Sequence, residues 1–522
     1  MKKTYAIGVF MLLAGMACAT QRFVKWDAAG ANNGTSWTDA YTNLADAIAQ
    51  MGVGDTQWVA RGTYYPGTNR TSAFTPFTNT VVCGGFAGTE SLLSQRTIAA
   101  NETILSGNIG DNSTSTDNCF HVVKTLGNGC VLDGLTIRDG YADSATPADQ
   151  NGGGLLAGGS LTVVNCLLTN NYAKALGGGI YSYSYGPNVL TNSMLTGNRC
   201  NGGDYLSGGG GLYVYFNFNG TMLVSNCQFV GNSATNGAGG GLCEYPNGSS
   251  MLTVSGCVIS NNVASDGGGF DCNGQCLCSN TVIALNQATS QGGGVYNFNN
   301  SGAQFNNCDL LGNSAPSGGA MMNGNPVLIN CRFRRNWATT IGGAICSSQY
   351  GNGALNNVTG CEFTGNYTTG SGNGGAIAGQ DDPLLFTSCT FSNNVTGGNG
   401  GAVYRIKVGA TTLGAVFLGC TFSGNIATNG GGAVYSGNVL APTNLVFTNC
   451  IFMFNAAAGA SKHGGAVMAT KGNQRYDNCT FYTNRATGNG GAIYQDAGST
   501  GTIHNSILWH DVAASGGAIL FR

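Results

Sequence analysis

The hydrophobic and polar positions of this chain repeat with a period of about 28 residues, from residue 166 to the C-terminus. One repeat, residues 420–435, reads C-T-F-S-G-N-I-A-T-N-G-G-G-A-V-Y. A bulky apolar residue stands two positions after the first residue of each repeat, and Asn stands five positions after it. Alternate residues of a β-strand point to one face, so the first residue and the bulky residue share a buried face. Because Asn and Gly tolerate left-handed backbone angles, the pattern predicts a strand, a turn and a second strand.

The repeated positions that we expect to form ladders fall into three sets. The cysteines at the first position are Cys166, Cys227, Cys257, Cys308, Cys331, Cys361, Cys389, Cys420, Cys450 and Cys479, and two other repeats have Ser193 and Thr281 there. The phenylalanines two positions later include Phe363, Phe391, Phe422, Phe452 and Phe481. The asparagines include Asn232, Asn366, Asn394, Asn425 and Asn484.

A repeat of this length, with two or three short strands, predicts one coil of a parallel β-helix. Stacked coils place equivalent strands about 4.8 Å apart, so like side chains lie above one another. No single coil can bury its inward face, so the stack as a whole must form the core. A helical solenoid is the competing architecture, but up to three glycines in each repeat disfavour it. The sequence therefore predicts an all-β parallel β-helix.

The first 120 residues have a different pattern and divide into two segments. Residues 1–19 have the features of a secretory signal peptide, with Lys2 and Lys3, an apolar core and a cleavage site after Ala19. Lipidation at Cys18 is an alternative. Residues 20–120 are predicted to form an N-terminal cap and the first irregular coils, and residues 121–522 the parallel β-helix repeats.

Local signals predict individual elements within residues 20–120. Residues 36–49 have an apolar face and two N-cap candidates, Ser36 and Thr38, which predict a short amphipathic helix. We expect this helix to cover the open end of the stack, where unpaired strand edges would recruit other chains. Strands are predicted at residues 57–64, 81–86 and 103–106. The last repeat stops in mid-coil, which leaves two alternatives: the natural chain continues, or a partner or a second rod covers that end.

Composition narrows the classes of partner. Hydrophobic residues make up 42% of the chain, which argues against disorder. Charged residues make up only 8% and the net charge is -2, so there is no electrostatic footprint for nucleic acid. No stretch after residue 19 is long and apolar enough for a transmembrane helix. The histidines show no metal-ligand spacing, and we expect no cofactor and no metal.

The spacing of the cysteines indicates a packing role more than a chemical one. Neighbouring positions of a parallel ladder point the same way, which strains any disulfide between them. We therefore expect buried thiols that act as small hydrophobic filler. A separate C-x3-C-x-C cluster comprises Cys272, Cys276 and Cys278. A metal there would lack a fourth ligand and the usual spacing, so a local disulfide or plain ladder positions are favoured.

Tyrosines form the best binding candidate. Tyr181, Tyr183 and Tyr185 alternate with Ser, and Tyr213 and Tyr215 follow one coil later. If these rings face outward, they stack into a platform for sugar rings or a protein partner. The alternative is that they fill the interior or the core of a loop.

Two groups of charged residues allow an enzymatic alternative. Asp133, Asp139 and Asp143 with Arg138 are candidates for a calcium site of the kind that lyases use. Residues 381–382 (Asp-Asp) and 405–407 (Arg-Ile-Lys) resemble fragments of the polygalacturonase site, but the companion motifs are missing. We interpret that second match as coincidence.

The alternation of Phe-x-x-Asn with Gly-Gly-Ala-Ile, as at residues 422–425, 481–484 and 490–493, resembles the repeats of the polymorphic outer-membrane protein family of autotransporter adhesins. Residues 34–37, 62–66 and 84–90 look like segments of bacterial secreted proteins with right-handed parallel β-helix repeats. Those proteins are similar in fold to pectate lyases. The resemblance implies a right-handed, single-stranded, pectin-lyase-like β-helix at the bacterial cell surface that binds host or neighbouring surfaces.

Together these observations predict a secreted or outer-membrane-associated protein with an adhesive or structural role and a glycan or protein ligand. The alternative is a polysaccharide lyase or glycoside hydrolase on the same scaffold, because fold does not determine function. A low charge content favours binding, since acidic glycans need basic side chains.

Overall fold

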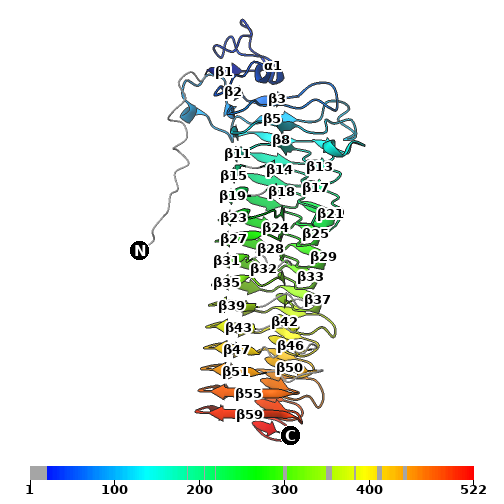
Figure 1. Ribbon diagram of the computed structural model, residues 1–522, viewed down its shortest axis with the longest axis vertical. Helices are drawn as coiled ribbons and strands as arrows, with labels where there is room; N and C mark the ends of the chain where they lie inside the picture. The colour runs from blue at the N-terminus through cyan, green and yellow to red at the C-terminus, as the bar shows by residue number, and fades with distance from the viewer. Residues whose placement is uncertain are drawn as a thin grey trace.

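The protein is a long all-β rod in the computed structural model (Figure 1). The structure describes residues 20–184, 186–204, 206–217, 219–297, 302–347, 355–380, 384–407, 414–438 and 444–521. Within these residues the helices are short: α1 (Leu44–Ala49), η2 (Leu93–Gln95) and η3 (Pro147–Asp149). The predicted signal peptide, residues 1–19, and its cleavage after Ala19 lie outside the described residues.

Four parallel sheets run along the rod, and we call them A to D. Sheet A has 17 strands, from β1 (Gln21–Val24) to β59 (Ser499–His504), and sheet B has 16, from β3 (Gly62–Tyr64) to β60 (Ile507–Trp509). Sheet C has 15 strands, from β6 (Val123–Thr125) to β61 (Ile519–Phe521), and sheet D has 13, from β9 (Tyr141–Ala142) to β57 (Arg485–Ala486).

One coil contributes one strand to each sheet in turn. The coil that begins near Cys420 contains β47 (Ala415–Leu418) in sheet A, β48 (Thr421–Ser423) in B, β49 (Ile426–Ala427) in D and β50 (Val434–Asn438) in C. Each pairs in parallel with its equivalent in the next coil; β48, for example, pairs with β52 (Ile451–Met453). The predicted all-β parallel β-helix is therefore confirmed, and its right-handedness stays a prediction.

Phenylalanine ladders fill the interior. Phe333, Phe363, Phe391, Phe422, Phe452 and Phe481 are fully buried on sheet B, and successive ring centroids lie 4.7 to 4.9 Å apart. A second ladder on sheet A, which includes Phe386, Phe417 and Phe447, meets the first edge to face. The ring spacing matches the separation of stacked strands, so each ring packs against the coil above and the coil below.

The asparagines form a continuous hydrogen-bonded ladder at the corner between sheets B and D. The amide Nδ2 of Asn394 donates to Oδ1 of Asn425 at 2.9 Å and to the carbonyl of Phe363 at 2.9 Å. The backbone N–H of Asn394 donates to the same Oδ1 at 3.1 Å. The ladder continues past Asn484, its last asparagine, because the backbone N–H and the Nδ2 of Asn484 both donate to Oδ1 of Asp511. Each amide thus satisfies buried backbone groups that the turn leaves unpaired.

The ladder cysteines are buried free thiols that also make hydrogen bonds. All ten ladder cysteines are buried, but their thiols make hydrogen bonds and do more than fill space. The N–H of Cys227 donates to Sγ of Cys257 at 3.4 Å, and that Sγ donates to the carbonyl of Ser255 at 3.4 Å. Hydroxyl groups take the same place, since the N–H of Cys257 donates to Oγ1 of Thr281. The ladder cysteines are thus buried free thiols, as predicted, and their hydrogen bonds explain why Ser or Thr can take the same place.

The N-terminal segment agrees with the predicted strands better than with the predicted helix start. Strands β4 (Val81–Phe86) and β5 (Thr103–Ser106) are confirmed, and residues 57–64 divide into β2 (Thr56–Ala60) and β3. The helix begins at Leu44, with Asn43 as its N-cap, because the hydroxyl of Ser36 donates instead to the carboxylate of Asp39. Helix α1 packs against β1 and β2. Its role as a cap and the domain boundary at residue 120 stay predictions.

Candidate functional site

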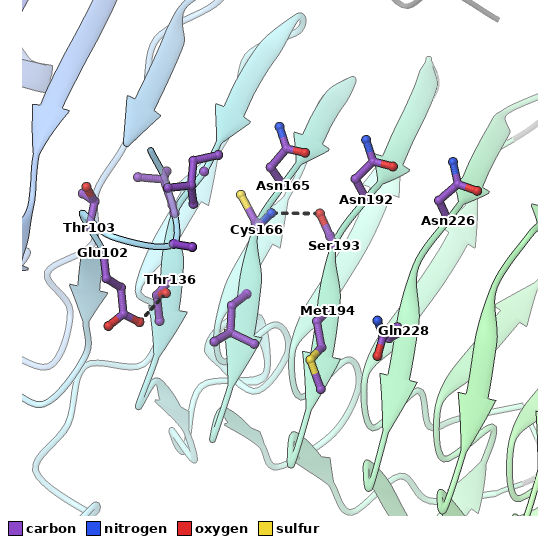
Figure 2. Close-up of a pocket in the computed structure, with 15 residues that line it drawn as sticks. Glu102, Thr103, Thr136, Asn165, Cys166, Asn192, Ser193, Met194, Asn226 and Gln228 are labelled. Carbon is purple, nitrogen blue, oxygen red and sulfur yellow. Dashed lines mark hydrogen bonds between the residues drawn. The ribbon is translucent and has the colours of Figure 1, made fainter. Parts of the chain in front are cut away.

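A groove of about 330 Å³ lies at the corner between sheets A and B, near the N-terminal end of the rod. Residues 98–103 form one side, and the outer faces of four successive coils form the other (Figure 2). We call it the corner groove, and its polar and apolar lining includes Ile98, Glu102, Thr136, Asn165, Leu167, Asn192, Met194, Asn226 and Gln228. The groove therefore begins at the segment that leads into β5 and continues across the coils that follow.

The row of asparagines in the groove follows from the backbone of the corner. Asn165, Asn192 and Asn226 each directly precede a ladder position and have φ of 54°, 49° and 53°. Asn is one of the few residues that adopt this left-handed conformation readily, and other coils have Gly there, such as Gly134. Since the conformation repeats from coil to coil, the three amides point the same way in Figure 2.

The floor of the groove comes from sheet B. Thr136 on β8 (Thr136–Arg138), Leu167 on β12 (Leu167–Thr169), Met194 on β16 (Met194–Thr196) and Gln228 on β20 (Gln228–Val230) are successive partners in the parallel register. An apolar strip, Leu167 and Met194, thus lies between two polar ends.

The polar side chains at the Glu102 end of the groove bond to one another, whereas those at the Gln228 end do not. The hydroxyl of Thr136 donates to Glu102 at 2.8 Å. Asn165 Nδ2 donates at 2.9 Å to Asp133, which forms an ion pair with Arg96 at 2.5 Å. The exposed amides of Asn192, Asn226 and Gln228 have no hydrogen-bond partner among the described residues. These amides can donate to and accept from a ligand's hydroxyl or acetamido groups.

The charge of the groove limits its chemistry. Glu102 is the only carboxylate among its lining residues, and no Lys or Arg lines it. Glycoside hydrolysis usually needs two carboxylates across the scissile bond, and acidic glycans need cationic partners. The corner groove is therefore suited to binding a neutral saccharide. The repeat pattern did not predict this groove, although Asn precedes six of the ten ladder cysteines in the sequence.

The predicted tyrosine platform exists in part. Tyr181 and Tyr183 lie on β14 (Ile180–Ser184), and Tyr213 and Tyr215 on β18 (Leu212–Phe216), with their rings on the outer face of sheet C. The ring centroids of Tyr181 and Tyr213 are 5.6 Å apart, and those of Tyr183 and Tyr215 are 5.1 Å apart. Tyr245 on β22 (Leu242–Tyr245), which the sequence analysis did not single out, extends the stack at 4.9 Å from Tyr215.

Accessibility differs among these rings. Tyr213 is only 2% exposed, and its hydroxyl donates to the carbonyl of Leu206, because the segment around Leu206 folds over it. Tyr213 therefore cannot contact a ligand directly. Burial raises the pKa of Tyr181 to about 12. Tyr183, Tyr215 and Tyr245 remain half-buried. Tyr185 lies outside the described residues.

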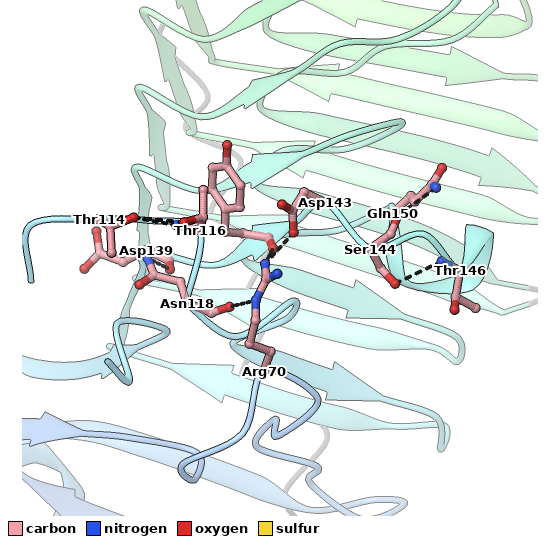
Figure 3. A network of polar contacts seen from close by, with 10 residues as sticks. Arg70, Thr114, Thr116, Asn118, Asp139, Asp143, Ser144, Thr146 and Gln150 are labelled. Atoms are coloured by element: carbon pink, nitrogen blue, oxygen red, sulfur yellow. Dashed lines mark hydrogen bonds and ion pairs between the residues drawn. The ribbon is translucent and has the colours of Figure 1, made fainter. Parts of the chain in front are cut away.

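Each acidic residue that the sequence offered for a calcium site forms an ion pair with an arginine. Asp143 pairs with Arg70, whose Nε also donates to the carbonyl of Asn118 (Figure 3). Asp139 pairs with Arg138 at 3.2 Å, and Asp133 with Arg96. Within the described residues no group of three or more His, Cys, Asp or Glu side chains could hold a metal ion.

Other candidate residues lie inside the rod. Arg405 is 1% exposed, so it cannot grip a sugar at the surface; residues 381–382 lie outside the described residues. Cys272, Cys276 and Cys278 are buried thiols, and Sγ of Cys278 lies 3.8 Å from Sγ of Cys308. Nearby, burial raises the pKa of Glu244 to about 8, and its two carboxylate oxygens have no hydrogen-bond partner in the described part of the chain.

The described part of the chain contains no helix long and apolar enough to cross a membrane. Three segments, residues 388–404, 419–437 and 478–496, match the model of the Chlamydia polymorphic membrane protein repeat. The predicted resemblance to polymorphic repeats is thereby confirmed in these segments, and it fits a bacterial surface protein. No curated protein sequence matched the chain.

Solved structures similar to this chain include pectate lyase Pel9A, with 15% identity, 63% of this chain and 78% of that chain covered, and a TM-score of 0.38. A mutant tailspike protein of E. coli bacteriophage HK620, in complex with a pentasaccharide, has 12% identity, covers 95% of this chain and 80% of its own, and has a TM-score of 0.34. A PL6 family alginate lyase, AlyGC, has 11% identity, 94% and 85% coverage, and a TM-score of 0.28.

Proposed function

We propose that this protein is a secreted or cell-surface rod of a bacterium that binds neutral glycans in the corner groove without cleaving them. The signal-like residues 1–19 support export, and the three polymorphic membrane protein repeat matches support a surface location. The row of exposed, unpartnered amides beside an apolar strip carries the proposal for the ligand.

The amides and the apolar strip fit the two surfaces of a sugar ring. Hydroxyl groups at the ring edge exchange hydrogen bonds with Asn192, Asn226 and Gln228. The C–H face of the ring packs on Leu167 and Met194. These residues stand on a rigid stack, so a ligand orders few side chains when it binds. A second candidate surface is the outer face of Tyr183, Tyr215 and Tyr245, whose rings could stack on sugars or on a protein.

Catalysis is the alternative on the same scaffold. Lyase or hydrolase chemistry in the corner groove would have to proceed with Glu102 as its single carboxylate and with no cationic side chain in the lining. This argument favours recognition, and an activity assay separates the two functions.

The test is a glycan array on the purified protein, with parallel assays for reducing ends and unsaturated products. We expect binding to neutral oligosaccharides and no product. Asn192→Gly removes one amide without backbone strain, because Gly occupies this corner in other coils. The matched control is Asn449→Gly, with φ of 55° at the same corner of a distant coil.

We expect Asn192→Gly to weaken binding about tenfold, as the loss of a hydrogen bond to a polar ligand does, and Asn449→Gly to leave it unchanged. Equal binding by both variants would remove the groove from the proposal and direct mutation to Tyr183 and Tyr215. Product release that copurifies with the protein would establish the enzymatic alternative.

A further inference from the structure

Basic residues concentrate in one coil in the middle of the rod. The chain has 21 Lys and Arg residues among 522, yet Arg332, Arg334 and Arg335 fall within four positions. Arg332 and Arg334 lie on the outer face of β36 (Arg332–Arg334) in sheet B, and Arg335 occupies the corner that follows. Trp337 begins β37 (Trp337–Ile341) in sheet D, which is labelled in Figure 1. One coil thus presents three guanidinium groups and an indole.

Two of the three arginines share one carboxylate. Arg332 pairs with Asp309 at 3.3 Å, and Arg334 pairs with both carboxylate oxygens of the same residue. Arg335 is exposed and has no hydrogen-bond or ion-pair partner among the described residues. The corner one coil later is Gly365, and a Cβ added there would lie 3.9 Å from Cγ of Arg335. The missing side chain leaves open space beside the Arg335 guanidinium.

Two stacked aromatic rings begin two residues after Arg335, on the next strand of the same coil. Trp337 and Tyr367 are register partners in sheet D, with ring centroids 6.2 Å apart and planes inclined by 11°. Tyr367 is 39% exposed, and the apolar column continues with Val395 and Ile426, which are similarly exposed. We call Arg335, Trp337 and Tyr367 the arginine–aromatic site.

We propose that the arginine–aromatic site binds an acidic saccharide. A planar guanidinium binds a carboxylate or sulfate through two parallel hydrogen bonds, and exposed aromatic rings pack against the C–H face of a sugar. The site is separate from the corner groove and does not depend on it, because it lies on other coils and other sheets.

The local charge favours a saccharide over an acidic peptide. The carboxylates of Asp309 and the neighbouring Glu362 offset two of the three arginine charges, so the net charge of this patch is about +1. Arg335 is the arginine of the three with no ion pair among the described residues. A flexible polyanion that depends on charge alone gains little from one exposed cation. A ligand that also covers Trp337 and Tyr367 adds apolar contact area to the ion pair.

The experiment is calorimetric titration of the purified protein with oligogalacturonate, a heparin oligosaccharide, neutral dextran and polyglutamate. The first two probes separate carboxylate from sulfate as the preferred anion. We expect one or both acidic saccharides to bind, with weaker binding as salt rises. Dextran should not bind at this site.

Arg335→Gln keeps an unbranched polar side chain at this corner but shortens it and removes the charge. We expect it to weaken acidic saccharide binding at least about tenfold. Tyr367→Phe, which keeps the ring, should bind nearly as well as the native protein, whereas Tyr367→Ala should bind several-fold more weakly. The matched control is Arg485→Gln, since Arg485 is an exposed arginine of sheet D that follows Ala456 in the register and has no aromatic partner there.

Equal losses in Arg335→Gln and Arg485→Gln would show diffuse charge attraction and overturn the proposal. Polyglutamate binding as tight as that of the saccharides would assign the surface to acidic peptides instead. Unchanged circular dichroism spectra establish that the variants fold. The corner-groove variant Asn192→Gly should bind the acidic saccharides normally, so failure of one site does not bear on the other.

Discussion

Asn394 is the position where the asparagine ladder can be tested most directly. Replacement with Ala removes four hydrogen bonds: two from Nδ2, to Phe363 and Asn425, and two from Asn366 to Oδ1. Asn425 keeps the backbone donor of residue 394, but the N–H of Asn366 and the carbonyl of Phe363 lose these partners. Two buried groups at about 1–3 kcal/mol each give an expected loss of about 4 kcal/mol.

The neighbouring Asn393 supplies the matched control. It is exposed, has φ of 54°, and lies at the same corner as Gly365 and Gly424 of the adjacent coils. Asn393→Gly relieves the left-handed strain, so we expect a change of less than about 1 kcal/mol in the free energy of unfolding.

The assay is urea unfolding combined with amide hydrogen exchange by mass spectrometry, because coils of a solenoid can open locally. Asn394→Ala should release protection in the coils that contain residues 366 and 425, and distant coils should change little. If Asn394→Ala and Asn393→Gly have the same stability, the ladder contributes nothing and the argument fails.

Two further predictions concern buried groups. Cys257→Ser should lower the free energy of unfolding by less than about 1 kcal/mol, because a hydroxyl can accept from the N–H of Cys227 and donate to the carbonyl of Ser255. Cys257→Ala, which removes both bonds, should lower it by about 1–3 kcal/mol. Equal losses for the two variants in calorimetry would show that the thiol only fills space. Burial raises the pKa of Glu244 to about 8 from an ordinary 4.5, so the folded state holds a proton that the unfolded state releases between these values. The free energy of unfolding should therefore be highest below pH 4.5 and fall by up to about 5 kcal/mol as pH rises to about 8. Glu244→Gln should reduce that pH dependence in urea titrations, and the buried Asp271, whose pKa burial also raises, should retain part of it.

The low average charge of the chain concealed its most basic surface. A charge content of 8% argued against acidic glycans, and that inference averages over all coils. In a solenoid each coil presents its own outward residues, so three arginines in one coil form a local patch whatever the rest of the chain contains.

The cysteines and tyrosines show a similar limit. Periodicity placed Cys257 inward, but inward placement does not reveal that its sulfur bonds to the backbone of the preceding coil. Alternation placed Tyr213 on the same face as Tyr215, yet a loop elsewhere in the coil covers Tyr213. The bond of Cys257 depends on a residue one coil away, and the burial of Tyr213 depends on the path of the segment around Leu206.

By itself, the sequence determined the parallel stack, the inward Phe and Asn ladders and the strands at residues 81–86 and 103–106. Those features follow from local rules, since strand alternation and left-handed turns need only a few consecutive residues. Only the tertiary structure decided the corner groove and the arginine–aromatic site. The groove forms because the segment before β5 stacks beside the corners of later coils, and Arg335 stays without an ion pair among the described residues while Asp309, one coil away, pairs with Arg332 and Arg334. Contacts between coils join residues that are distant in sequence, and no local pattern encodes them.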